Sequence, residues 1–102
     1  MALPELDVAW DPIKAQANLA KHGVSFAQGA TVLLDPLALT VFDAVHSQNE
    51  ERWFTLGRSS EGALLAVAHT YEVTGPATAR VRIISARPAT RREHEQYQNE
   101  PR

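Results

Sequence analysis

The chain has 102 residues, no cysteine and a formal net charge of −2, with 44% hydrophobic and 22% charged residues. This length and composition fit one soluble globular domain, and they exclude a disordered tail, a disulfide framework, a thiolate metal site and a cysteine nucleophile. No signal-peptide pattern opens the chain and no apolar run approaches the ~20 residues of a membrane span. We therefore expect a single cytoplasmic domain over residues 1–102.

The segment 12–22 is predicted to be a helix. Asp11 is a good N-cap, Pro12 suits the first helical position, and Gly23 can end the helix in the left-handed conformation. Helical spacing gives this segment two faces, of which one is apolar and expected to pack while the other is cationic. The apolar face carries Ile13, Ala17 and Ala20, and the cationic face carries Lys14, Asn18 and Lys21, with His22 beside them.

A second helix is predicted to begin after Ser25, which forms a capping box with Gln28, and to end at Pro36. Beyond this proline the pattern becomes that of strands, expected at residues 37–43, 51–57, 63–71 and 79–87. Short links at 58–62 and 72–78 favour hairpins, so the four strands should form an antiparallel meander. With a helix after the last strand, the order is typical of an α+β domain whose helices cover one face of the sheet.

The junction between the fourth predicted strand and the last helix is cationic. Thr90 and Glu93 form a capping box, so the helix should begin there. Residues 80–92 contain five arginines and no acidic residue. A helix N-terminus already carries partial positive charge, so this corner favours a bound anion such as phosphate. The alternative is that Glu93 and Glu95 neutralise Arg91 and Arg92 and that this turn is a solvated helix face, and both interpretations stay open.

An ordered set of short motifs runs along the chain: Trp10-Asp11-Pro12, Lys14, Asn18, Lys21-His22-Gly23-Val24, Phe26, Arg52, Gly57, Ile84-Ser85-Ala86-Arg87, Arg91 and Glu93. Together these residues resemble the BrnT toxins over about residues 10–97. The resemblance implies a compact RelE-like fold, with two N-terminal helices packed on the four-stranded antiparallel sheet and a C-terminal helix. It further implies the toxin of a bacterial type II toxin–antitoxin system, an endoribonuclease that inhibits translation by cutting RNA.

The resemblance also implies the partners. A BrnA-type antitoxin would neutralise the toxin, and the antitoxin dimer would hold two toxin molecules in a heterotetramer. Operator DNA would be bound only through the antitoxin, by a ribbon-helix-helix domain. No cofactor and no membrane contact are implied.

Cleavage by a ribose 2′-hydroxyl needs removal of its proton, stabilisation of charge on the phosphoryl oxygens and a proton for the leaving 5′-oxygen, but no metal. Arginine suits the second task because its planar fork matches phosphate oxygens. We assign the scissile phosphate to Arg87 and Arg91, with Arg52 as a third candidate. The predicted catalytic residues are His22, Lys21, Arg52, Arg87, Arg91 and Tyr97, and the predicted RNA-binding residues are Lys14, Asn18, Arg58 and Arg82.

Among the four histidines, His22 is the first choice for acid or base, because an imidazole titrates near working pH. It could instead only help to close its helix. His69 lies inside a predicted strand, which favours a hydrogen-bonded structural histidine, and His46 lies in a loop where its role cannot be assigned. No two histidines are three or four residues apart, so a helix-borne zinc site is not predicted.

A binding module is the alternative to an enzyme. A toxin-like domain could dock an antitoxin or a ribosomal component without cutting RNA, and the acidic net charge of −2 favours this hypothesis. Substitution of Arg87 and Arg91 would separate the two, because an enzyme loses cleavage whereas a docking module can keep its partner.

Overall fold

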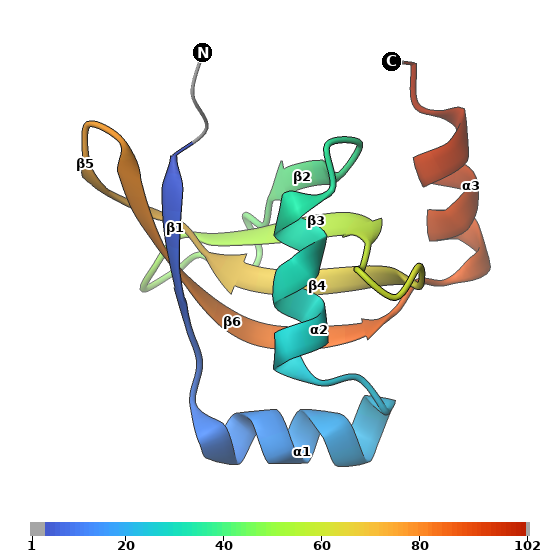
Figure 1. Cartoon of the computed structure of the whole chain (residues 1–102), viewed down its shortest axis with the longest axis horizontal. Coiled ribbons are helices and arrows are strands. Elements are labelled where there is room, and N and C mark those ends of the chain that lie inside the picture. Colours follow the sequence, from blue (N-terminus) through green and yellow to red (C-terminus); the bar gives the residue numbers. More distant parts are fainter. Residues whose placement is uncertain (1–3, 102) are drawn as a thin grey trace.

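A computed structural model of the chain describes residues 4–101 (Figure 1). Its elements are β1 (Glu5–Ala9), α1 (Pro12–His22), α2 (Phe26–Thr31), the 3-10 helix η1 (Val32–Leu34), β2 (Leu39–Phe42), β3 (Arg52–Arg58), β4 (Leu64–Thr70), β5 (Glu72–Gly75), β6 (Thr78–Pro88) and α3 (Arg91–Asn99). None of the helices in this described part is long and apolar enough to cross a lipid bilayer.

The strands form one six-stranded mixed sheet in the order β1-β6-β4-β3-β2, with β5 paired to β6. β1 runs parallel to β6, with Val8 opposite Val81, and the other pairs are antiparallel. The α+β class and the C-terminal helix are confirmed, and β2, β3, β4 and β6 each end within two residues of a predicted strand. The prediction of a four-stranded, wholly antiparallel sheet is wrong.

The two strands that the sequence did not predict both depend on β6. Glu5 of β1 pairs with Thr78, which lies 73 positions further along the chain (78 − 5), so no local pattern announces the pairing. β5 falls in the segment 72–78 that was predicted to be a turn, and its Val73 is exposed. A strand without a buried face lacks the alternation by which strands are recognised. The eleven residues of β6 supply the missing partner for both.

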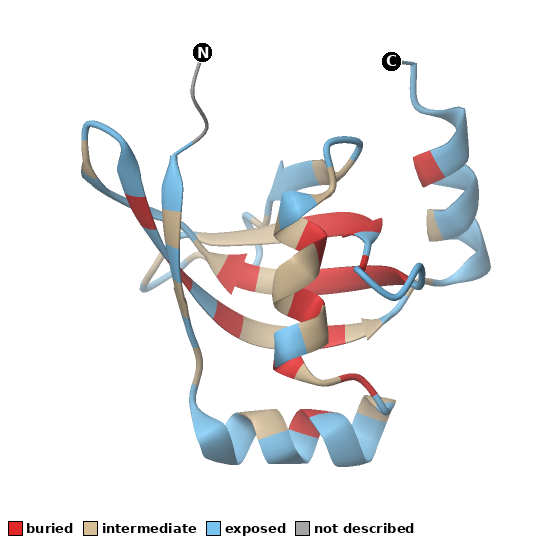
Figure 2. Ribbon diagram, viewed as in Figure 1, coloured by how far each residue is buried: buried red, intermediate tan, exposed pale blue. Residues whose placement is uncertain are grey.

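The main core lies between α2 and one face of the sheet, where buried residues gather in Figure 2. Gly29 allows α2 to approach, because a Cβ at this position would lie 2.9 Å from the Cβ of Ala86. The core residues are Val24, Phe26, Val32, Leu65, Val67, Val81, Ile83 and Ala86.

The opposite face of the sheet is covered in part by α3, whose Tyr97 is buried with Leu56, Leu64 and Ala66. The expectation that the helices cover a single face is therefore wrong. Successive residues of β4 from Leu64 to Val67 are all buried, although they alternate between the two faces. A sheet with apolar residues on both faces needs a helix on each.

α1 lies along the outer edge of β6 and packs through Asn18 and Ala15, not through the predicted apolar face. The Nδ2 of Asn18 donates to the carbonyl oxygens of Ala86 at 2.8 Å and Val24 at 3.0 Å, and its Oδ1 accepts from the Ala86 N–H at 3.1 Å. Ile13 is 77% exposed. An open strand edge presents unpaired N–H and C=O groups, which an amide satisfies and an apolar stripe does not.

Candidate active site

The sheet face opposite α2 carries a row of arginines. Alternate residues of β3 share this face, so Arg52, Phe54 and Arg58 lie on the side of Leu56, which packs against α3. Directly opposed residues of neighbouring strands also share a face. The strand register therefore extends this face across β4 and β6. Thr70 lies opposite Arg52, and Ala68 lies between Phe54 of β3 and Ser85 of β6. Ala66 likewise lies between Leu56 and Arg87.

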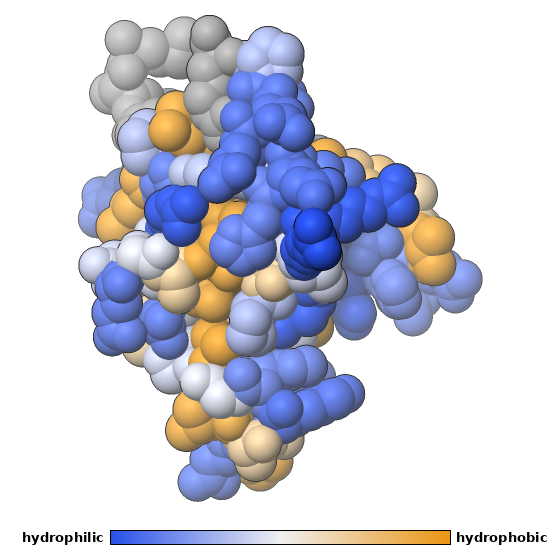
Figure 3. All heavy atoms as spheres, turned by 90° about the vertical axis from the view of Figure 1, so that its right-hand side faces the viewer, coloured by the Kyte–Doolittle hydropathy of each residue, from blue (hydrophilic) through white to orange (hydrophobic). Residues whose placement is uncertain are grey.

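α3 covers the Arg58 end of this surface and leaves the rest accessible. Arg82 also belongs to the accessible part, because its guanidinium group contacts the Glu50 carboxylate, which also contacts Arg52. We call this part the open face, and it consists of Arg52, Phe54, Ala68, Thr70, Arg82, Ser85 and Arg87. Figure 3 views the molecule from the side of α3, where hydrophilic side chains gather beside a hydrophobic strip.

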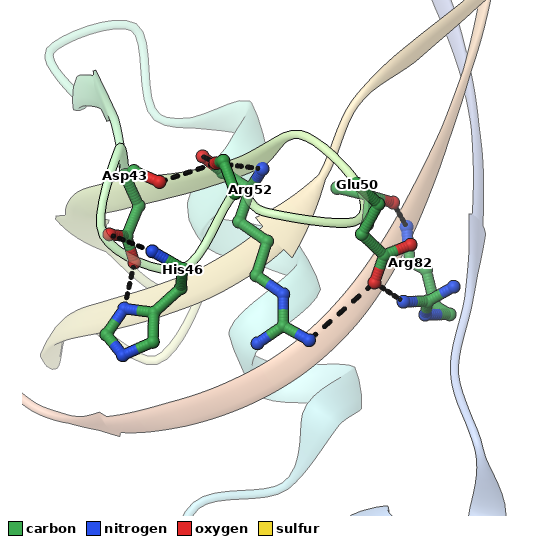
Figure 4. Close-up of polar contacts among 7 residues, drawn as sticks. Asp43, His46, Glu50, Arg52 and Arg82 are labelled. Carbon is green, nitrogen blue, oxygen red and sulfur yellow. Dashed lines mark hydrogen bonds and ion pairs between the residues drawn. The ribbon is translucent and has the colours of Figure 1, made fainter.

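At one end of the open face, two arginines share one carboxylate. Glu50 Oε1 accepts a hydrogen bond from Arg82 Nη2 and lies 3.7 Å from Arg52 Nη2 (Figure 4). The arginine side chains are 35% exposed for Arg52 and 47% exposed for Arg82. Solvent, and so a ligand, reaches both side chains, although the Nε of Arg52 is buried. A cavity of about 740 Å³ that adjoins this end is bordered by Arg80 and Arg82.

At the other end, Arg87 forms a two-pronged ion pair with Glu93. Its Nη1 and Nη2 donate to the two carboxylate oxygens at 2.7 Å and 3.0 Å. This hydrogen bonding outweighs burial and raises the pKa of Arg87, which therefore stays positively charged. The Arg87 guanidinium also lies 5.5 Å from the ring centre of Phe54. At the predicted anion corner, Glu93 thus pairs with Arg87. The alternative interpretation of the sequence instead had Glu93 and Glu95 neutralise Arg91 and Arg92, of which Arg91 lies 3.8 Å from Glu95.

The docking of α3 should depend on pH, because the Glu93 carboxyl group that holds Arg87 can be protonated. The hydrogen bond from Arg87 lowers the pKa of Glu93, burial opposes this, and the hydrogen bond from the Thr90 N–H lowers it further, so that it lies below its ordinary value of 4.5. A carboxyl group with a lowered pKa stabilises the fold above its ordinary pKa and loses that contribution as pH falls through the lowered value.

We expect α3 to exchange its amide hydrogens faster, after correction for the intrinsic effect of pH, as pH falls from about 6 to about 3. Hydrogen-exchange mass spectrometry of α3 peptides measures this. In Glu93→Gln the protection should be lost at both pH values, whereas Glu95→Gln, which alters an exposed carboxylate, should behave as wild type. An unchanged acid response in Glu93→Gln would contradict the assignment.

The loop between β2 and β3 is closed by hydrogen bonds. The Asp43 N–H donates to the Arg52 carbonyl oxygen at 2.8 Å, and the Arg52 N–H donates to the Ser47 hydroxyl at 2.9 Å. The Asp43 carboxylate accepts from the backbone N–H of His46 at 3.3 Å and contacts its Nδ1 at 2.8 Å. His46, Glu50 and Arg52 line a cavity of about 390 Å³ under this loop.

The structure brings together three of the predicted site residues, Arg52, Arg82 and Arg87, on the open face. Lys14 lies near Arg82, because both line a cavity of about 340 Å³. Arg58 shares the sheet face but lies at the end covered by α3, with its guanidinium 5.5 Å from the ring centre of Tyr97.

Two predicted site residues serve the fold. The Tyr97 ring is buried, and its hydroxyl donates to Asp35 Oδ2 at 2.7 Å, which ties α3 to the segment after η1. Asn18 is buried, and its amide is engaged by the backbone of residues 24 and 86. Tyr97 thus contributes to packing and Asn18 to the strand edge, and their predicted roles in catalysis and RNA binding stay predictions.

Three other predicted catalytic residues lie apart from the open face. The Arg91 side chain is 95% exposed on α3 and lies 3.8 Å from Glu95. Lys21 and His22 end α1, as expected of cations near a helix C-terminus. Within residues 4–101, neither makes a hydrogen bond or ion pair with the open face. The structure does not bring these three residues together with the open-face arginines.

The structural role of His69 is confirmed, since it is buried and hydrogen-bonded at both ring nitrogens. Its Nδ1 lies 2.8 Å from the Thr70 carbonyl oxygen, which can only accept, so Nδ1 carries the hydrogen. Its Nε2 then accepts from the Thr55 hydroxyl at 2.7 Å. Burial lowers the pKa of His69, and the hydrogen bond to Thr70 opposes this only in part, so the ring is neutral near pH 7.

Three side chains of this site were missed from the sequence: Glu50, Phe54 and His46. Neither Glu50 nor Phe54 lies in a local sequence motif that marks a site. For His46 a signal existed, because an aspartate three residues before a histidine in a turn can bind both its backbone and its ring.

The chain is similar to known proteins in sequence and in fold. Residues 10–93 match a family model described as "Ribonuclease toxin, BrnT, of type II toxin-antitoxin system". Among solved structures, the chain is similar to the Brucella abortus ribonuclease toxin BrnT, with 24% sequence identity and a TM-score of 0.56, over 85% of this chain and 99% of that one. At this identity the similarity shows the fold. No curated protein matches the chain.

Proposed function

The chain belongs to the family of BrnT ribonuclease toxins of type II toxin–antitoxin systems, and on this premise we propose that it is a metal-independent endoribonuclease that inhibits translation. The observation that carries the proposal is the convergence of Arg52, Arg82 and Arg87 on one accessible sheet face. Three fixed cations on a surface bordered by cavities suit a polyanionic strand.

Each open-face group has a task in this proposal. Arg87 and Arg52 bind oxygens of the scissile phosphate and stabilise the negative charge that develops when the 2′-hydroxyl attacks. Arg82 and Lys14 hold neighbouring phosphates. The half-buried Phe54 ring, which already faces the Arg87 guanidinium, offers a flat surface for a base to stack on.

The carboxylates have a task as well. Glu50 and Glu93 pair with the arginines when no RNA is present, which keeps the guanidinium groups in position without leaving them unpaired. A phosphate that binds these arginines competes with the two carboxylates. RNA affinity should therefore depend strongly on salt and less on base sequence.

A type II toxin has a cognate antitoxin, and we propose that this one is of the BrnA type, with two toxins held by one antitoxin dimer and DNA bound only through the antitoxin. The exposed edge strand β2 supports a protein partner, because Val41 is 58% and Phe42 47% exposed there. RNA and ribosomes are cytoplasmic in bacteria, so the proposal places the toxin in the cytoplasm.

The pairing of every open-face arginine with a carboxylate favours a second candidate, the non-catalytic docking module. Cell-free translation of a defined message with the purified protein separates the two. The ribonuclease lowers protein synthesis and leaves message fragments on a denaturing gel, whereas a docking module lowers synthesis with the message intact. An unchanged rate of synthesis and an intact message, from a folded sample, would contradict both.

A further inference from the structure

We propose that His46, oriented by Asp43, is the general base that removes the 2′-hydroxyl proton when RNA is cut at the open face. The inference rests on the proposed ribonuclease function and adds to it a residue and a role. It places the base on the loop between β2 and β3, and not at the end of α1 where the sequence suggested His22.

The geometry of the loop fixes the imidazole. Nδ1 of His46 lies 2.8 Å from Asp43 Oδ2, and an ionised carboxylate can only accept, so Nδ1 carries the hydrogen in this pair. Burial alone would raise the pKa of Asp43, but the side-chain and backbone hydrogen bonds from His46 lower it below its ordinary value. The aspartate is thus ionised near pH 7. This leaves Nε2 of the neutral ring with a free lone pair.

The second ring nitrogen is available to a substrate. The His46 side chain is 65% exposed, and Nε2 makes no hydrogen bond or ion pair in the part of the chain that the structure describes. The loop itself is held, because Ser47 donates to the Asp43 carbonyl oxygen and accepts from the Arg52 N–H. An oriented imidazole with one nitrogen held and the other free is the arrangement that proton transfer requires.

The imidazole lies beside the phosphate-binding cations. His46, Glu50 and Arg52 line the same cavity, and Figure 4 shows the His46 ring and the Arg52 guanidinium directed to the same side of the loop, with Glu50 and Arg82 beyond them. A phosphate held by Arg52 therefore has a histidine next to it. The charged groups around His46 are Asp43, which it contacts, and Glu50 and Arg52, which line the same cavity.

The proposed step balances without a metal. Nε2 takes the proton of the ribose 2′-hydroxyl, the 2′-oxygen forms a bond to phosphorus, and the bond from phosphorus to the 5′-oxygen breaks. The leaving 5′-oxygen takes a proton from water, and the resulting hydroxide removes the proton from the imidazolium. The products are a 2′,3′-cyclic phosphate and a 5′-hydroxyl end. Asp43 acts as a positioning residue that also stabilises the imidazolium.

Other groups fit this role less well. The Oε1 of Glu50 is already shared by two arginines, Arg52 and Arg82. His69 is buried and both of its ring nitrogens are hydrogen-bonded. His94 is exposed on α3, beyond the Arg87–Glu93 pair.

The test is the pH dependence of single-turnover cleavage of a defined RNA, with EDTA present, for wild type, His46→Gln, Asp43→Asn, Glu50→Gln and His94→Gln. In His46→Gln we expect a rate lower by about 10²–10⁴-fold and loss of the ionisation that a histidine base contributes to the pH–rate profile, with RNA affinity unchanged. Asp43→Asn should also lower the rate, because the imidazole loses the carboxylate that orients it. His94→Gln should behave as wild type.

The outcomes separate this inference from the proposed function. A wild-type rate and pH profile in His46→Gln, when the wild type cleaves, overturns the role of His46 and leaves the ribonuclease standing. If the ionisation in the pH–rate profile is lost in Glu50→Gln and survives in His46→Gln, then Glu50 is the base, and the role of His46 is again overturned. A wild type that does not cleave overturns both. Weakened RNA binding in His46→Gln with an unchanged pH profile would show a binding role, contrary to the proposal.

Discussion

Replacing Arg87 with alanine is expected to lower RNA cleavage by about 10²–10³-fold, because a preorganised donor to the developing phosphoryl charge is lost. The fold should survive. The Arg87–Glu93 pair is partly exposed, with side chains 34% and 15% accessible, so we expect its loss to weaken the docking of α3 and to leave the core between α2 and the sheet intact. Single-turnover cleavage rates, with urea unfolding of the same samples, measure both quantities.

Two further variants sharpen the Arg87 experiment. Arg87→Lys keeps the charge and removes the planar fork, so we expect a rate between those of wild type and alanine variant. Arg92→Ala is the matched control, because it removes an exposed arginine on α3 that forms no part of the open face. Equal losses in Arg92→Ala and Arg87→Ala would mean that net charge, and not the open face, decides the rate.

The largest expected effect on stability comes from Asn18→Ala. This substitution removes three hydrogen bonds and leaves the N–H and C=O of Ala86 and the C=O of Val24 without their partner in a buried setting. Each such group costs about 1–3 kcal/mol, so we expect a loss of roughly 3–5 kcal/mol after some relaxation. That is a large share of the about 5–15 kcal/mol that stabilises a typical domain.

Urea unfolding of Asn18→Ala measures this effect, with Gln16→Ala as the control on an exposed position of the same helix. The control should stay within about 0.5 kcal/mol of wild type. If Asn18→Ala instead keeps wild-type stability and binds RNA more weakly, then the sequence-based assignment of Asn18 to RNA binding was right and the structural one is wrong.

Local signals in the sequence predicted both ends of α1 and the start of α3, but not the end of α2, which was expected at Pro36 and lies at Thr31. Asp11 caps α1 by accepting from the Ile13 N–H at 2.8 Å, Gly23 adopts the left-handed conformation with φ of 70°, and the box formed by Thr90 and Glu93 is complete. Such signals involve residues three or four apart, which are close in any helix. β1 could not be predicted in this way, because its partner strand is remote in sequence.

The packing face of α1 could not be predicted for a different reason. Helical periodicity assumes that a helix packs through apolar side chains, and here its neighbour is the hydrogen-bonding edge of β6. Asn18 therefore points inward and Ile13 outward. The same limit applies to the site. The sequence suggested Arg52 and Arg87, but strand register decides which cations lie together. The pairing of Glu50 with Arg82, for example, spans 32 positions (82 − 50).

The most direct test of the central claim is the chemistry of the cut ends. Purified protein is incubated with a defined RNA in EDTA, and the fragments are analysed by mass spectrometry, with Arg52→Ala/Arg87→Ala and Arg92→Ala alongside. Our account predicts fragments with 2′,3′-cyclic phosphate and 5′-hydroxyl ends from wild type and Arg92→Ala, and none from the double variant. Intact RNA from a folded wild-type sample, or undiminished cleavage by the double variant, would contradict it.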